Sequence, residues 1–178
     1  MKKSAGQNPF PSFSKHEGAT KMARNCPHIA LPAYRYLPGT MAKDEDRSDL
    51  PKLKFEDLPP QAWRKNEPYL YGIDLYHEGY FYEAHEVWEE LWHRVGHHSP
   101  QGQFLKALIQ LAAARLKLRM GEEKPARRLV GTLQKILITL SSSTKEEFWM
   151  GIDLKKLIDA CEQNAFDKIG EIRLELKG

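Results

Sequence analysis

Residues 79–92 read Gly-Tyr-Phe-Tyr-Glu-Ala-His-Glu-Val-Trp-Glu-Glu-Leu-Trp, and this stretch decides both the fold class and the candidate site. Each residue of an α-helix advances by about 100°, so side chains three or four positions apart share a face. The apolar side chains of the stretch fall in one broad arc, which we expect to face a core. Gly79 and Gly96 flank residues 80–95, and glycine is common where helices end. The pattern predicts an amphipathic helix over residues 80–95.

Residues that mark the beginnings of helices also occur on both sides of this segment. Prolines stand where further helices should begin, at positions 68, 100 and 125, and Asn66 and Ser99 are candidate caps. The predicted helices span residues 67–78, 80–95, 100–120 and 123–140, with a fifth at about 154–164 capped by Asp153. No segment before residue 168 alternates as a strand would. We therefore predict an all-α domain over residues 66–166, a small multi-helix bundle of antiparallel helix hairpins.

The two ends of the chain have a different character. Eight of the 11 prolines precede residue 66, and proline favours extended or turn conformations. We predict a disordered segment over residues 1–28, an extended Pro-rich N-terminal arm over 29–65 and an extended C-terminal tail over 167–178. The aromatic and leucine side chains of residues 29–40 favour an arm that packs onto the domain. A tethered linker is the alternative.

Two of the predicted hairpins share a spacing of small residues, which lets antiparallel helices approach closely. The matching sets are Gly72, Gly79, Ala84 and Trp88 in the first hairpin and Ala114, Gly121, Ala126 and Val130 in the second. The spacing is similar to that of a tetratricopeptide hairpin. However, the two units lie 42 residues apart, whereas that repeat has a period of about 34 residues. The spacing therefore favours two similar hairpins over a repeat array.

Charge and cysteine content exclude several classes of function. Residues 1–65 hold 12 Lys/Arg and 7 Asp/Glu, a net charge of +5, while the remainder has a net charge of −2. A nucleic-acid-binding domain normally shows a basic face on its folded part, so we expect no nucleic-acid partner. The longest apolar run is too short to span a membrane. Two cysteines without a CxxC pair fit a reducing cytoplasm, where we expect the protein to reside.

The predicted helix 80–95 carries a candidate chemical site at the edge of its apolar arc. His85 and Glu89 lie one turn apart at that edge, with Glu86 as a third member, whereas Glu83 and Glu90 are predicted to point to solvent. An imidazole and a carboxylate in this arrangement can bind one divalent metal ion. Alternatively, Glu89 fixes the tautomer of a His85 that acts as a general base. A third reading is a hydrogen-bond network that only closes the core.

The His-Glu-x-x-Glu pattern supplies too few ligands for a metal by itself, so a second helix should contribute. Helix 100–120 is the natural donor because it is apolar around most of its circumference. Its narrow polar stripe contains Lys106, Gln110 and Lys117. Gln110 either is buried and meets His85 and Glu89, or belongs to a solvent-facing side. His77 has no evident partner, and the histidines at 93, 97 and 98 cluster at a helix end.

These residues also resemble a known family. The stretch 79–92, followed by Phe104-Leu-Lys-Ala-Leu-Ile-Gln-Leu-Ala-Ala-Ala114, is similar to the domain-of-unknown-function 309 family over about residues 70–140. The resemblance implies a small helical bundle and the label of a predicted metal-dependent hydrolase. The polar motif positions that carry over are Glu83, His85, Glu86, Glu89 and Gln110.

Two departures from the family pattern concern histidines. Many members have a Pro-His-Pro stretch after the arm, where this chain has Thr40-Met-Ala-Lys43, and a histidine about where Lys117 stands. A lysine ammonium repels a cation and cannot ligate it. If those histidines complete a metal site in the family, this chain lacks them.

Two hypotheses about function follow. The first is a hydrolase of an unknown small-molecule substrate, with a divalent metal held by His85 and Glu89 and with Glu86 and Gln110 as further catalytic residues. The second is a non-catalytic, tetratricopeptide-like helical module that binds a protein partner or forms a homo-oligomer.

Overall fold

A computed structural model describes residues 23–39, 50–162 and 169–177 of the chain. The elements in order are the 3-10 helix η2 (Pro60–Lys65), α1 (Glu67–His77), α2 (Phe81–Val95), α3 (Pro100–Arg119), α4 (Glu123–Thr144), β1 (Phe148–Trp149), β2 (Ile152–Asp153) and α5 (Leu154–Ala160). The predicted all-α class is confirmed. None of the described helices is long and apolar enough to cross a membrane.

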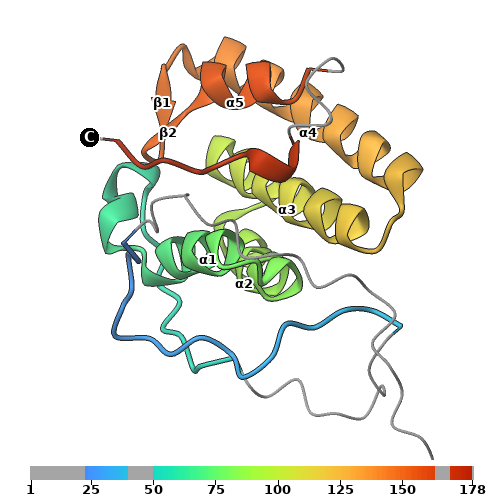
Figure 1. Ribbon diagram of the computed structural model, residues 1–178. Helices are drawn as coiled ribbons and strands as arrows, with labels where there is room; N and C mark the ends of the chain where they lie inside the picture. Colours follow the sequence, from blue (N-terminus) through green and yellow to red (C-terminus); the bar gives the residue numbers. More distant parts are fainter. Residues whose placement is uncertain (1–22, 40–49, 163–168, 178) are drawn as a thin grey trace, which may run out of the picture.

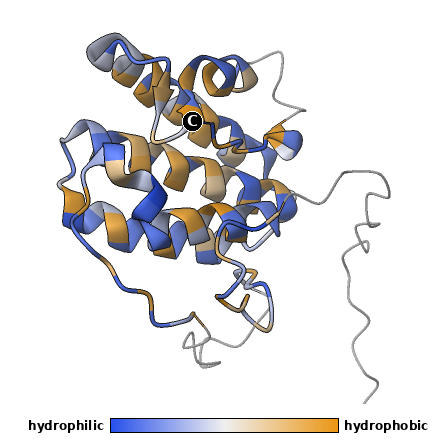
Figure 2. Ribbon diagram, turned by 90° about the vertical axis from the view of Figure 1, so that its left-hand side faces the viewer, coloured by the Kyte–Doolittle hydropathy of each residue, from blue (hydrophilic) through white to orange (hydrophobic). Residues whose placement is uncertain are grey.

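The helices form two hairpins that pack on each other through α2 and α3. Figure 1 shows α1 and α2 side by side, α3 above them, and α4 and α5 on the far side of α3. Ten of the 20 residues of α3 are buried, because neighbours cover it on both sides. In Figure 2 the helices carry both hydrophobic and hydrophilic residues, as expected for helices with one apolar face. The central position of α3 agrees with the apolar character of residues 100–120 around most of the helix.

The predicted helix caps occur as expected. The side chains of Asn66, Ser99 and Asp153 each accept a backbone N–H three residues further on, at 3.1, 2.9 and 2.8 Å respectively. Such bonds satisfy donors that have no partner inside the helix. α4 runs four residues beyond its predicted end at residue 140 and stops at Lys145, whose φ is 55°. α5 ends at Ala160, short of the predicted residue 164.

The expectation of no strand before residue 168 is wrong in one place. β1 and β2 form an antiparallel pair in which Phe148 faces Asp153 and Trp149 faces Ile152. The turn between them places Met150 and Gly151 at positive φ values of 47° and 82°. Strands of two residues each are too short to show an alternating pattern, so the sequence could not reveal them.

α1 and α2 pack tightly where Gly72 meets Trp88. The Trp88 side chain is fully buried, and its Nε1–H donates to the Tyr69 carbonyl at 3.3 Å. A Cβ on Gly72 would overlap the indole ring. The small residue predicted at this position is thus required by the packing of the largest core side chain.

Residues 24–37 lie against the helical domain (Figure 1, blue). The buried Asp74 carboxylate accepts three hydrogen bonds of 2.8 Å, from the backbone N–H groups of Asn25 and Cys26 and from the Asn25 side chain. The Tyr71 hydroxyl donates to the Ala30 carbonyl at 2.8 Å. These contacts favour the packed arm over the tethered linker.

The boundaries predicted for the N-terminal part need correction. Of the segment 1–28 that was predicted to be disordered, residues 1–22 lie outside the described residues. Residues 23–28 are docked on the domain, and Cys26 is only 2% exposed. The buried Asp74 carboxylate on α1 binds Asn25 and Cys26 of this segment, and the composition of the segment does not reveal that interaction. Residues 60–65 of the predicted extended arm form η2 instead, while residues 40–49 lie outside the described part.

The C-terminal tail packs against α1 and corrects the prediction for His77. Residues 169–171 form a helical turn, and residues 172–177 follow without a regular helix or strand. The Leu174 backbone N–H donates to His77 Nε2 at 3.0 Å, and the Tyr76 hydroxyl donates to the Ile172 carbonyl at 3.3 Å. His77 therefore has a partner 97 residues away, which no local pattern indicates.

We predict that Gly72→Ala lowers the free energy of unfolding by about 1–3 kcal/mol, because overpacking a core costs this much. Urea denaturation measures the change. Gly131→Ala on α4 is the matched control, since its new Cβ would have no neighbour within 4 Å. That substitution should be neutral or stabilise by up to about 1 kcal/mol through its higher helix propensity. Equal effects of both substitutions would contradict the close approach of α1 and α2.

We predict that stability falls as the pH is lowered from about 6.5 to about 4. Burial, assisted by the positive charge of Arg173, lowers the pKa of His77 from 6.5 to about 4. The unfolded chain then binds a proton in this range that the folded chain does not, so acid favours unfolding. A shift of this size corresponds to on the order of 3 kcal/mol. Urea denaturation at several pH values should show a smaller loss for His77→Gln, and an unchanged pH dependence would contradict the assignment.

Candidate functional site

The candidate site lies on α2, whose orientation is fixed by its buried face. Phe81, Ala84, Val87, Trp88 and Leu91 are buried, as the apolar arc predicted. With these side chains in the core, His85 and Glu89 lie at the edge of the contact, partly buried, with side-chain exposures of 28% and 42%. The predicted edge position of this pair is thus what the structure shows.

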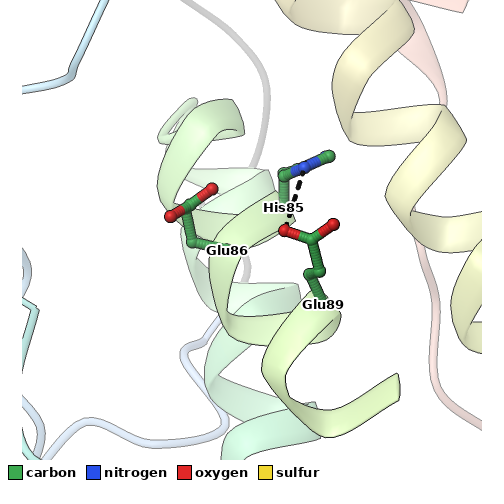
Figure 3. Close-up of side chains that lie close together, drawn as sticks. All are labelled: His85, Glu86 and Glu89. Carbon is green, nitrogen blue, oxygen red and sulfur yellow. Dashed lines mark ion pairs between the residues drawn. The ribbon is translucent and has the colours of Figure 1, made fainter. Parts of the chain in front are cut away.

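His85, Glu86 and Glu89 form a group that could hold a metal ion. One ligand atom from each lies within 4.8 Å of the others. The His85 Nε2 and Glu89 Oε2 atoms are 3.7 Å apart. Figure 3 shows these two side chains together on one side of α2, whereas the Glu86 carboxylate points to another side.

The geometry can be compared with that of a bound metal. Bond lengths of about 2.0–2.2 Å place neighbouring ligand atoms of a tetrahedral site about 3.4 Å apart. The His85–Glu89 separation of 3.7 Å is close to this value. Glu86 needs a side-chain rotation to approach the same ion. The pair therefore forms the centre of the group and Glu86 its adjustable member.

Gln110, the predicted helper from α3, is partly exposed. Within the described ranges no hydrogen bond joins it to His85, Glu86 or Glu89. The fully buried Gln110 considered from the sequence is therefore not observed. Lys117 Nζ lies 2.8 Å from Glu122 Oε2, so this ammonium is occupied by an ion pair near the surface.

Glu83 is where the sequence interpretation was wrong. It was expected to point to solvent, but it is 6% exposed, and its Oε1 accepts the Tyr36 backbone N–H at 2.7 Å. Burial raises the pKa of its carboxyl group, and the Tyr36 N–H partly opposes that shift. The arm covers the side of α2 that carries Glu83, so a polar side chain on that side is shielded from solvent. The tyrosines and prolines of the arm were the available signal, because they need a surface to pack on.

The histidines at the end of α2 form a second, exposed cluster. His93 Nδ1 and His97 Nε2 are 3.2 Å apart. The His97 ring stacks on Trp92, with centroids 3.8 Å apart and planes 10° apart. Both imidazoles are exposed. Any metal-binding measurement on this protein must separate them from His85.

Fold and site together define a small all-α protein of two helix hairpins, with a docked N-terminal arm and an imidazole–carboxylate group on its second helix. Residues 69–129 match the model of a family described as "Domain of unknown function (DUF309)". The match supports the resemblance inferred from the sequence, and it spans α1, α2, α3 and the start of α4. A search of curated proteins gave no match for this chain.

We predict that His85→Ala changes the free energy of unfolding by less than about 1 kcal/mol, because a partly exposed ion pair contributes little. Thermal melting or urea denaturation measures it. Asp74→Ala is the contrast. It removes the buried acceptor of three hydrogen bonds, so it should cost several kcal/mol. A loss of 2 kcal/mol or more in His85→Ala would instead support a structural network at His85.

Proposed function

We propose that this protein binds one divalent metal ion at His85, Glu86 and Glu89 and acts as a metal-dependent hydrolase. The observation that carries the proposal is the grouping of three ligand atoms within 4.8 Å on a partly buried edge of α2. One nitrogen and two carboxylate oxygens form a donor set suited to zinc, manganese or iron. The family match gives no activity, so the substrate is described only by the chemistry of the site.

The His85 and Glu89 side chains are partly exposed, so water can reach the proposed site. Three ligands from one helix leave further coordination positions for water and substrate, as in catalytic metal sites. A bound ion would supply Lewis acidity and lower the pKa of its bound water. His85 Nε2 and a carboxylate oxygen of Glu89 would bind the ion together, and Glu86 would complete the ligand set. Gln110 is assigned the role of orienting substrate or water from α3.

The alternative function is a non-catalytic helical module for protein–protein interaction or self-association. The close Gly72–Trp88 packing agrees with the hairpin spacing that suggested it. However, large contiguous apolar patches normally mark protein-binding surfaces. Of the large hydrophobic side chains in the described ranges, Ile138 and Phe148 are exposed, at 47% and 37%. They lie on α4 and β1, so they add no apolar surface to the hairpin of α1 and α2. The metal site is therefore the better-supported proposal.

We predict one equivalent of bound metal in protein stripped on a chelating resin and reloaded with zinc or manganese. Elemental analysis after gel filtration measures the stoichiometry, and calorimetric titration measures the affinity. Truncating a ligand removes a metal bond, so His85→Ala and Glu89→Gln should weaken binding at least about tenfold. The same variants should abolish metal-dependent hydrolysis of p-nitrophenyl phosphate or acetate.

Two controls keep this test specific. Glu90→Gln alters an exposed carboxylate of the same helix that pairs with Arg94, and it should leave metal binding unchanged. The double variant His93→Gln/His97→Gln removes the exposed imidazole pair and should also retain the equivalent of metal. Metal that is lost in the double variant but kept in His85→Ala would overturn the proposal.

A further inference from the structure

Two guanidinium groups from distant parts of the chain converge on the turn between α1 and α2. Arg119 Nη1 donates to the Gly79 carbonyl at 2.6 Å, and Arg35 Nε donates to the Glu78 carbonyl at 3.0 Å. Arg119 Nη2 and Arg35 Nε lie 2.9 and 3.6 Å from the position of a Cβ built on Gly79. The end of α3 and the N-terminal arm thus place their charges beside the same glycine.

Arg115 adds a third guanidinium from one turn earlier on α3. Its Cζ lies 4.6 Å from the centroid of the Phe81 ring, and the Arg119 Cζ lies 4.7 Å from the same centroid. Arg115 Nη1 also donates to the Tyr76 hydroxyl at 3.1 Å. The first residue of α2 is therefore in contact with two positively charged side chains.

This cluster keeps an excess of positive charge. Burial lowers the pKa of Arg119, and repulsion from Arg35 and Arg115 lowers it further. The Glu83 carboxylate acts in the opposite direction, but within the described ranges no ion pair joins it to any of the three arginines. Glu83 is the carboxylate that acts on Arg119, and it opposes the repulsion from Arg35 and Arg115 only in part, since the pKa of Arg119 stays lowered. A bound anion would balance the remaining positive charge.

The cluster also has unused hydrogen-bond donors. A guanidinium group offers five N–H donors, and each of these three arginines makes one hydrogen bond among the residues described. The N-cap residue of α2, Tyr80, provides no side-chain cap. The N-terminus of this 15-residue helix, which is the positive end of its dipole, lies beside the arginines that contact Phe81. Forked donors and positive charge are the features that recognise phosphate groups.

We infer that Arg35, Arg115 and Arg119, with the N-terminus of α2, form a binding site for a phosphate-type oxyanion carried by a small molecule. A small ligand is favoured over a nucleic acid because residues 66–178, which supply Arg115, Arg119 and α2, have a net charge of −2, whereas a nucleic-acid-binding domain normally has a basic face on its folded part. Phe81 lies one helical turn, a rise of about 6 Å, from His85. The inference stands independently of metal binding or hydrolysis at His85.

The test is a calorimetric titration of the full-length, metal-stripped protein with inorganic pyrophosphate at constant ionic strength. We expect saturable binding of one equivalent. Arg35→Ala should weaken it at least about tenfold, since a hydrogen bond to a charged group is lost. Arg35 is exposed, so its replacement leaves the core intact. Arg119→Lys keeps the charge but loses the fork, and it should weaken binding to a smaller extent.

Two control variants separate the site from general effects of charge and of arm docking. Arg128→Ala removes an exposed arginine of α4 and should leave the affinity unchanged. Tyr71→Phe removes the hydrogen bond that the arm makes at Ala30 but keeps all three arginines, so it should also bind normally.

Three results would overturn the inference. The first is an absence of saturable binding to wild-type protein. The second is an affinity that Arg35→Ala leaves unchanged or that Arg128→Ala lowers equally, which would assign the arginines a purely structural role. The third is tighter binding of a single-stranded oligonucleotide than of pyrophosphate, which would exclude a small-molecule site.

Discussion

The contact between the Trp88 indole and Gly72 is the constraint on which the rest of the structure depends. Trp88 fills the space between α1 and α2, and its Nε1–H donates to the Tyr69 carbonyl. The ring fits only because Gly72 has no side chain. This contact fixes the rotation of α2 about its own axis, and every other side chain of α2 takes its direction from that rotation. His85 and Glu89 come to the edge of the core, while Glu83 faces the arm.

Buried carboxylates of α1 and α2 hold the N-terminal arm in place. Asp74 receives three hydrogen bonds from Asn25 and Cys26, and Glu83 receives the Tyr36 N–H. A buried charge is costly unless donors surround it, so the arm and these carboxylates stabilise each other. The arm covers the side of α2 that carries Glu83. His85 and Glu89 lie on a different side and remain partly exposed.

The two proposed sites use opposite charges on one short helix. At the middle of α2, an imidazole and two carboxylates offer lone pairs to a cation. At its N-terminus, guanidinium groups from α3 and the arm meet the positive end of the helix dipole. An anion bound there would offset both the charges of the arginines and the positive end of the helix. A molecule with an anionic group and a hydrolysable bond could contact both sites.

The sequence by itself determined the helices, their caps and the core edge, because these depend on interactions over three or four residues. Asn66, Ser99 and the His85–Glu89 pair all belong to this group. Tertiary structure decided what short-range patterns do not contain. Glu83 was assigned to solvent because the arm that covers it lies 47 residues earlier, and His77 gained its partner from the tail 97 residues later. Periodicity shows which side of a helix is apolar, but only the folded chain determines which polar sides other segments cover.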